Sequence, residues 1–248
     1  QTLRITMFLE HKYLKFKGLN LTLETLDGLV KHNGPYKKMN KLNSIIGIKN
    51  FKNKISFNKN TSLEAQIASI SDDIAYNNHD IQDGIKANLF LLNDLIEINF
   101  FKEIYKSYKS KVKKNNSDIV IYQIIRDSIN LMVEDVISNT LKNIKKYKIK
   151  NISNIYNKSD NIVSFSNNFK NIESEIKVFL KKNMYNNKNV VKKNENGKKI
   201  VKTLFKNIYS NPKKYKKNLI IDNDKARSIS DYIAGMTDRF AIQLYKSL

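Results

Sequence analysis

The stretch from Ser62 to Gly84 separates its side chains into two faces when it is wound as an α-helix of 3.6 residues per turn. Four isoleucines share one side of this helix: Ile67, Ile70, Ile74 and Ile81. An apolar stripe of this kind must pack against another part of the molecule. Thr61 and Glu64 have the spacing of a capping box, which predicts the start of the helix, and Gly84 marks its end or a weak point.

The opposite face carries a ladder of acidic and phenolic side chains. Asp72, Tyr76 and Asp80 are four residues apart, so each lies about 40° around the axis from the one before. His79 and Asp83 lie beside them. Two interpretations are open. Either the acids form a solvated face and pair with lysines, or the face is the wall of a site in which Asp72 binds a metal ion and the other two contact a substrate.

Few residues in this chain break helices. Its 248 residues include seven glycines and two prolines, and this favours an all-α fold over a many-turned β fold. The length allows one large domain or two small ones. The chain contains no cysteine, which excludes disulfides and thiolate metal sites and leaves oxygen and imidazole ligands for a hard or borderline divalent ion.

The net charge of +22 predicts a polyanionic partner, either a triphosphate substrate or a nucleic acid. The lysines are dispersed among asparagine and isoleucine, however, and compositional drift in an AT-rich genome explains that pattern equally well. No apolar run approaches the roughly 20 residues that a membrane-spanning helix needs. No signal peptide is visible either, so we expect a cytoplasmic protein without a membrane partner.

Apolar periodicity predicts most of the remaining elements. The helix that follows Gly18 begins at a cap formed by Asn20 or Thr22 and stops at Gly34 and Pro35. Further helices are expected over residues 1–16, 87–108, 118–147, 169–185, 203–209 and 225–245. Non-helical segments are expected over residues 37–60 (a long loop), 109–117 (a linker), 148–168 (irregular) and 188–200 (an exposed basic turn, KNVVKKNENGKKI).

Three separate segments carry a family resemblance: GLNLTLETLDGLVKHNGP (18–35), EAQIASISDDIAYNNHDIQDGIKA (64–87) and RSISDYIAGMTDRFA (227–241). In this order they resemble the deoxyguanosine triphosphate triphosphohydrolase-like proteins, a branch of the HD-domain metal phosphohydrolases. The resemblance implies the C-terminal portion of an HD-domain helical bundle over residues 1–110. A helical C-terminal region over 111–248 would follow and end with the DYIAGMTDRFA helix. The histidine and His-Asp metal motifs of the family would lie upstream of Gln1, in a longer protein.

The resemblance also implies roles for the acidic ladder. Asp72 would be the last ligand of a divalent metal, with Mg²⁺ or Mn²⁺ preferred and Fe, Co or Zn as alternatives. Asp73 is the second candidate, because adjacent acids point about 100° apart and only one can face the metal. Tyr76 would lie against the deoxyribose and leave no room for a ribose 2′-hydroxyl, and Asp80 would accept a hydrogen bond from the 3′-hydroxyl. Ordinary alternatives are a core position for Tyr76 and a lysine ion pair for Asp80.

Two cationic side chains would contact the substrate phosphates on the same grounds. Lys31 is one of them, although its ammonium group could instead only stabilise the negative end of its helix. Arg227 is the other. Arg239 flanks the same motif and could equally form an interhelical ion pair. Gly235 implies a close approach between helices.

The three histidines of the chain do not stand in the family's ligand context; they are His11, His32 and His79. The adjacent pair His79 and Asp80 follows Tyr76, whereas the family's name-giving pair lies in a separate upstream motif. A surface or supporting role is therefore expected for His79.

The implied function is metal-assisted hydrolysis of a deoxynucleoside triphosphate, dGTP-like, to a deoxynucleoside and tripolyphosphate. The intact protein would catalyse it, and this chain alone would be inactive because one aspartate does not form a metal site. The alternative is a basic helical module that binds single-stranded nucleic acid or partner subunits without catalysis. A pseudoenzyme that modulates a catalytic partner is a third hypothesis. A homo-oligomer is expected from the family.

Overall fold

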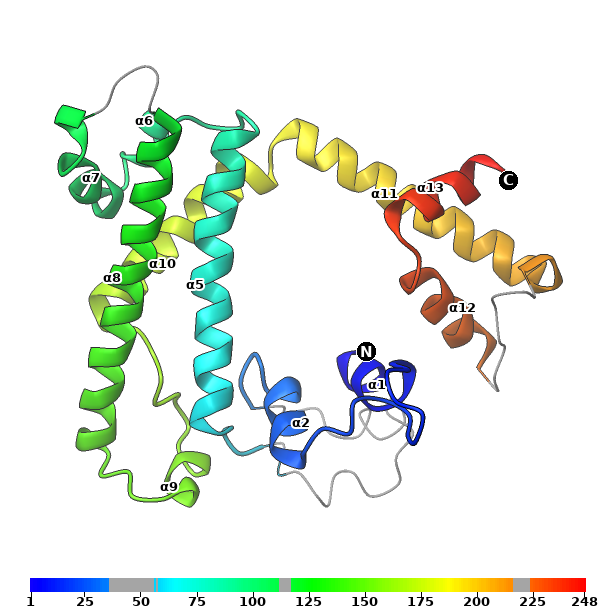
Figure 1. Cartoon of the computed structure of the whole chain (residues 1–248), viewed down its shortest axis with the longest axis horizontal. Coiled ribbons are helices and arrows are strands. Elements are labelled where there is room, and N and C mark those ends of the chain that lie inside the picture. Colours follow the sequence, from blue (N-terminus) through cyan, green and yellow to red (C-terminus); the bar gives the residue numbers. More distant parts are fainter. Residues whose placement is uncertain (36–55, 57, 112–116, 216–223) are drawn as a thin grey trace. The chain divides into compact units, whose positions relative to one another are not determined.

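The computed structural model describes residues 1–35, 56, 58–111, 117–215 and 224–248, and all of its described regular elements are helices (Figure 1). This confirms the predicted all-α fold. Most of the loop expected over 37–60 and the centre of the linker expected over 109–117 lie outside the described residues. No helix in the described part of the chain is both long and apolar enough to cross a membrane.

The described chain forms two compact units, Gln1–Leu180 and Lys181–Leu248. The division predicted after residue 110 rests on the family resemblance, not on packing, and it stays a prediction.

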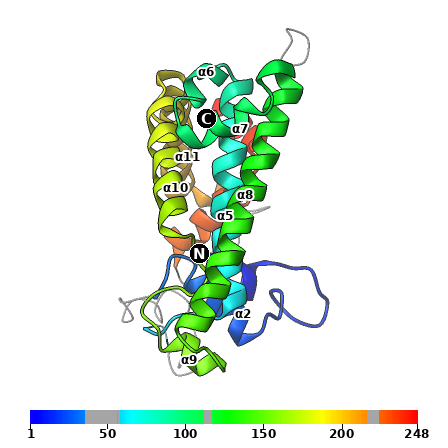
Figure 2. The same ribbon diagram turned by 90° about the vertical axis from the view of Figure 1, so that its left-hand side faces the viewer.

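Three long helices lie side by side in the first unit (Figures 1 and 2): α5 (Leu63–Lys86), α8 (Ser117–Lys146) and α10 (Asn167–Leu180). Their apolar residues recur at intervals of three and four, so each helix turns one stripe toward the others. Ile81 and Met132 are completely buried in this core. The predicted helix over 118–147 is confirmed almost to the residue by α8.

Shorter helices surround these three. They are α1 (Thr2–Arg4), the π-helical turn η1 (Ile5–Leu9), α2 (Leu23–Val30), α6 (Leu92–Leu95), α7 (Asn99–Lys106), the 3₁₀ turn η3 (Lys109–Lys111) and α9 (Ile152–Tyr156). α2 packs against α5, and α7 packs against α8. The helical turns at the start of the chain end at Leu9, so the predicted helix over 1–16 is wrong beyond that residue. The segment over 148–168, which was expected to be irregular, contains α9.

The start of α5 differs from the predicted capping box. Ser62 is the cap, since its hydroxyl accepts a hydrogen bond from the Ala65 amide at 3.3 Å. Thr61 instead turns its hydroxyl toward Asp27 of α2, 3.1 Å away. At the start of α2 the cap is Thr22, which was one of the two residues predicted for this role.

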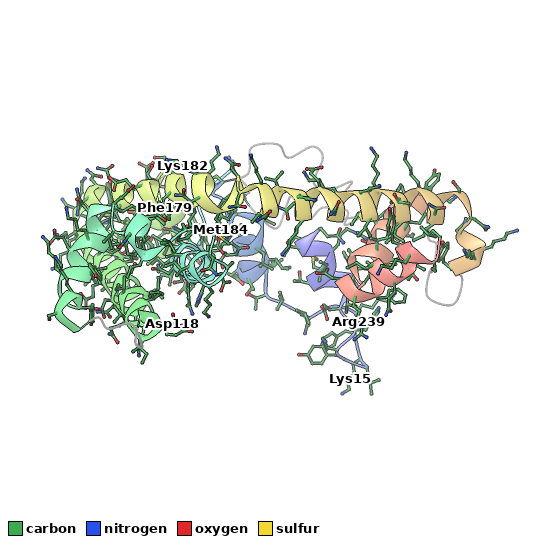
Figure 3. All side chains as sticks on the ribbon, turned by 90° about the horizontal axis from the view of Figure 1, so that it is seen from above. Lys15, Asp118, Phe179, Lys182, Met184 and Arg239 are labelled. Carbon is green, nitrogen blue, oxygen red and sulfur yellow. The ribbon has the colours of Figure 1, made fainter. Side chains whose placement is uncertain are left out.

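The end of α5 is fixed by packing. Gly84 does not end the helix, which continues to Lys86. A Cβ on Gly84 would lie 2.2 Å from a ring carbon of Phe90, so only glycine admits this ring. Phe90 in turn packs edge-on against Phe179 of α10, with ring centroids 4.9 Å apart; Phe179 is labelled in Figure 3.

The apolar stripe of α5 is only partly as predicted. Ile74 and Ile81 are buried, whereas Ile67 is 50% exposed. Two asparagines, Asn77 and Asn78, are buried where the pattern did not predict them.

The helix expected over 87–108 is interrupted between α6 and α7. Leu91 adopts an extended conformation, and its amide donates to the Asp94 carboxylate at 2.7 Å, which starts α6 as a separate turn. α7 then begins at Asn99 after an extended Ile98.

The second unit consists of η4, a π-helical turn (Lys181–Tyr185), α11 (Lys188–Ser210), the 3₁₀ turn η5 (Pro212–Tyr215), α12 (Lys225–Ala234) and α13 (Asp238–Lys246). Both α12 and α13 pack against α11 (Figure 1). The core cluster of this second unit consists of Leu204, Ile208, Tyr215 and Ile229.

Two sequence predictions are wrong in this unit. The basic turn expected over 188–200 is the first half of α11, because its lysines and glutamate are good helix formers and Gly197 is accommodated as a helical residue. The helix expected over 225–245 is two helices. It breaks at Gly235, and Thr237 caps α13 by accepting from the Phe240 amide at 3.3 Å.

Candidate functional site

The end of α2 lies directly against the first turns of α5. A Cβ on Gly28 would lie 2.7 Å from the Cβ of Ala65, so the two backbones approach closely at this point. One turn further along α5, the Ser69 hydroxyl donates to the carbonyl of His32 at 2.8 Å. Together these contacts place the residues that follow α2 next to the acidic ladder.

Lys31 is buried where these helices meet. Its ammonium nitrogen is 2.5 Å from the Asp27 carboxylate and donates to the Asn60 carbonyl at 3.3 Å, and its side chain is only 3% exposed. Thr61 donates to the other oxygen of the same carboxylate. The charge of Lys31 is therefore compensated inside the protein. The phosphate contact predicted for it stays a prediction, and the geometry supports a structural role.

A small cavity of about 230 Å³ opens beside Lys31. Tyr156 of α9 lines it together with Asp27. Burial raises the pKa of the Tyr156 phenol above its usual value, and the negative charges of Asp27, Glu24 and Glu64 raise it further.

The start of α5 is also tied to a segment about a hundred residues away. The Asn60 amide group donates to the Asp160 carbonyl at 3.1 Å. The side-chain oxygen of Gln66 accepts from two backbone amides, those of Ile162 at 2.8 Å and Val163 at 3.1 Å. These contacts were not anticipated from the sequence.

The acidic ladder of α5 lies on its open face. The Asp72 side chain is 62% exposed, Tyr76 is 64% exposed, and Asp80 is partly buried. Tyr76 is therefore not a core residue within this chain. The ladder faces solvent in this chain. The metal and sugar contacts predicted for these three residues stay predictions.

The two adjacent aspartates point to different neighbours. Asp72 lies 3.8 Å from the His32 imidazole at the end of α2, and Asp73 lies 4.0 Å from the Lys177 ammonium group on α10. Burial lowers the pKa of Lys177, but its hydrogen bond to Glu173 and the charges of Glu173 and Asp73 outweigh this and raise the pKa overall. Asp73 is thus engaged with α10, whereas Asp72 lies beside the imidazole of His32 at the end of α2.

The described residues do not form a metal site by themselves. They contain no cluster of three or more histidine, aspartate and glutamate side chains that could hold an ion. Asp72 and His32 are a pair of donors, while His11 and His79 are exposed elsewhere. The donor set around Asp72 is therefore too small for a tightly bound divalent ion.

The predicted arginines lie in the second unit. The Arg227 guanidinium is 3.6 Å from Asp224, the residue that caps α12. Arg239 is exposed on α13 (Figure 3). The close helix approach predicted at Gly235 is wrong, since the nearest atoms to a Cβ there are carbonyl oxygens of its own helix at 3.6 Å.

A second polar ladder, which the sequence did not single out, runs along α8. Asp135, Asn139 and Asn143 are four residues apart and all bind the segment that leads into α10. The signal in the sequence is this i, i+4 spacing of three polar residues along one face of an amphipathic helix.

A family model matches the C-terminal part of the chain, and several known proteins match its whole length. Residues 163–247 match the family model of the phosphohydrolase-associated domain. The whole chain is 62% identical to a deoxyguanosinetriphosphate triphosphohydrolase-like protein of Pelagibacter ubique, 40% identical to one of Rickettsia typhi and 37% identical to one of Bartonella henselae. It covers 67%, 66% and 64% of those relatives, respectively, so it spans about two thirds of their length.

Proposed function

Because this chain belongs to the deoxyguanosinetriphosphate triphosphohydrolase-like family, we propose that the intact protein hydrolyses deoxynucleoside triphosphates, including dGTP, to deoxynucleoside and tripolyphosphate. The observation that carries the proposal is the open face of α5, where Asp72, Tyr76 and Asp80 follow one another at single turns. The activity is proposed for the whole protein, because the chain spans only about two thirds of its relatives.

In this proposal the ladder binds the sugar. The exposed ring of Tyr76 packs against the C2′ side of a deoxyribose, where a ribose hydroxyl would clash. Asp80 accepts a hydrogen bond from the 3′-hydroxyl, since an ionised carboxylate offers only acceptors. Arg227, and Lys31 if its pair with Asp27 opens, would contact the phosphates.

We also propose that Asp72, not Asp73, supplies one carboxylate to a divalent metal, Mg²⁺ or Mn²⁺ before Fe, Co or Zn. The engagement of Asp73 with Lys177 supports this choice. Since the described residues do not complete a metal site, no step of the reaction is assigned to the ion. The 248-residue chain alone is expected to bind Mn²⁺ only weakly in a calorimetric titration, and tight binding that depends on Asp72 would contradict this.

The proposal is tested with the intact protein and dGTP, by chromatography for deoxyguanosine and ³¹P NMR for tripolyphosphate. Asp72→Asn is expected to lower kcat about 1000-fold, because a lost metal ligand removes several kcal/mol of transition-state stabilisation. Asp73→Asn and Asp83→Asn are matched controls on the same helix and are expected to keep most of the activity. Tyr76→Ala is expected to weaken discrimination against GTP. Full activity in Asp72→Asn, or none in the intact protein, would refute the proposal.

One observation favours the second candidate function, a module that binds single-stranded nucleic acid. Five lysines share the side of α11 opposite its buried residues Leu204 and Ile208. They are Lys188, Lys192, Lys199, Lys202 and Lys206. Such a stripe can follow a phosphate backbone.

Salt dependence separates this candidate from the hydrolase. Counterion release predicts that the affinity for an oligonucleotide falls steeply with salt, with a slope of about −0.7 per phosphate neutralised. A Lys199→Gln, Lys202→Gln, Lys206→Gln variant should then show a smaller slope. Binding that is absent at low salt rules the module out. The homo-oligomer, the pseudoenzyme and the cytoplasmic location stay predictions.

A further inference from the structure

A polar cleft in the first unit is lined by none of the acidic-ladder residues of α5. Its volume is about 640 Å³, within the range of small-molecule sites. The lining comes from the C-terminal half of α8, the first turn of α10 and the segment between α9 and α10, together with Gly34 and Pro35 after α2. Lys146 of α8 and Lys170 of α10 both line it.

The wall of this cleft is held by the polar ladder of α8. Asp135 accepts from the Ser166 amide at 2.8 Å and from its hydroxyl at 2.7 Å. Asn139 donates to the Ser164 carbonyl at 2.8 Å, and Asn143 donates to the carbonyl of residue 162 at 2.9 Å. The wall is therefore ordered before any ligand arrives, which lowers the entropic cost of binding.

The charge of the cleft is positive. Lys146 lies three residues beyond Asn143, on the side of α8 that faces the cleft. Within the described part of the chain, neither Lys146 nor Lys170 has an ion-pair partner, and Asp160 is the one carboxylate among the lining residues. A third ammonium group, that of Lys158, lies 4.4 Å from the ring centre of Tyr147, which lines the cleft.

We propose that this cleft binds a small phosphoryl anion with two or more negative charges, either an inorganic phosphate or a phosphate monoester. Lysine ammonium groups bind phosphate as point charges. The hydroxyl of Ser159 and the amides of Asn161 and Asn167, which also line the cleft, supply neutral donors for the remaining oxygens. This inference does not depend on the proposed hydrolysis, because none of the ladder residues of α5 lines the cleft.

Isothermal titration calorimetry of the 248-residue chain with inorganic phosphate and with ribose 5-phosphate tests the proposal and distinguishes the two sources of the anion. The double variant Lys146→Gln, Lys170→Gln is expected to bind the preferred probe at least about tenfold more weakly, because two charge-assisted contacts are lost. Asp160→Asn is expected to bind it about threefold more tightly, because a repelling charge is removed. Opposite effects of this kind cannot come from a general loss of folding.

Two controls locate the binding. Lys145→Gln changes an exposed lysine on the same helix that does not line the cleft and should leave the affinity unchanged. Asp72→Asn should also leave it unchanged, which separates the cleft from the α5 face. The proposal is overturned if neither probe binds saturably, or if Lys145→Gln weakens binding as much as Lys146→Gln does. Lys170→Gln alone serves if circular dichroism shows that the double variant is unfolded.

Discussion

The side chain of Gln66 connects the start of α5 to a distant segment of the chain. It is almost fully buried, accepts from two amides of the segment before α10 and donates to the Thr61 carbonyl at 3.0 Å. Buried polar groups cost free energy when they are left without partners. Gln66 therefore stabilises both the start of α5 and the wall of the neighbouring segment.

We expect Gln66→Ala to lower the free energy of unfolding by about 3 kcal/mol, because it strands two buried amides and one carbonyl at roughly 1 kcal/mol each or more. Urea denaturation followed by circular dichroism measures this loss. Gln82→Ala, on the same helix and without such contacts, should change stability by less than about 0.5 kcal/mol. Equal effects of the two substitutions would show that the hydrogen bonds of Gln66 contribute nothing.

Tyr108 gives a pH-dependent contribution to stability. Its hydrogen bond to Asp127, together with burial and the charge of that carboxylate, raises the pKa of the phenol. A raised folded-state pKa means that the folded state binds the proton more tightly. The stabilisation is therefore complete below the unfolded pKa of about 10 and is lost as pH rises through the higher folded value.

The test compares the wild-type chain with Tyr108→Phe between pH 8 and pH 11.5. The difference in unfolding free energy between the two proteins should be constant up to about pH 10 and shrink above it. In an Asp127→Asn background the same comparison should show a much weaker pH dependence, since the main cause of the shift is gone. A difference that grows with rising pH would contradict the assignment.

The residue scale also shows what spacing can and cannot reveal about a site. The side chains of Asp72 and Asp73 point in different directions because adjacent residues of an α-helix are about 100° apart around its axis. The structure accordingly gives them different neighbours. Asp27 and Lys31 have the i, i+4 spacing that allows an ion pair on a helix. The sequence does not reveal that this pair is buried, because its burial depends on Asn60 and on packing between separate helices.

At the scale of elements, periodicity predicted helices but not where they break. α8 was predicted well because its apolar pattern continues without an internal cap. The segment over 87–108 and the last helix were each predicted as one helix, since the caps formed by Asp94 and Thr237 interrupt the backbone without interrupting the apolar pattern. α11 was missed in its first half because that half is exposed and has little apolar periodicity.

Two glycines with open space around them should respond to alanine in opposite ways. Among the described residues, no atom beyond the chain neighbours lies within 4 Å of a Cβ built on Gly197 or on Gly34, but Gly197 is inside α11 and Gly34 has a φ of +90°. Gly197→Ala is expected to stabilise its unit by about 0.5 to 1 kcal/mol, because alanine favours the helix. Gly34→Ala is expected to destabilise by about 1 kcal/mol, because an L side chain strains that φ. Thermal denaturation of both variants gives the signs, and the same sign for both would contradict this account.

At the scale of the whole molecule, the described residues form two compact units, and each has buried apolar residues of its own. The first is built on α5, α8 and α10, and the second is a small cluster around Leu204 of α11. A unit as short as Lys181–Leu248 buries a smaller fraction of its surface than a longer one does, so its own stability is modest. We therefore expect two unfolding transitions in calorimetry, not one.

Reciprocal core substitutions assign these transitions. Leu204 and Ile81 are both completely buried, one in each unit, and truncation of such a residue to alanine costs about 2–5 kcal/mol. Leu204→Ala should lower one melting temperature by roughly 10 °C or abolish that transition, since a short unit has a small unfolding entropy. Ile81→Ala should lower the other by about 5 to 15 °C. If each substitution shifts both transitions equally, the units unfold as one cooperative body and the division at Leu180 has no thermodynamic meaning.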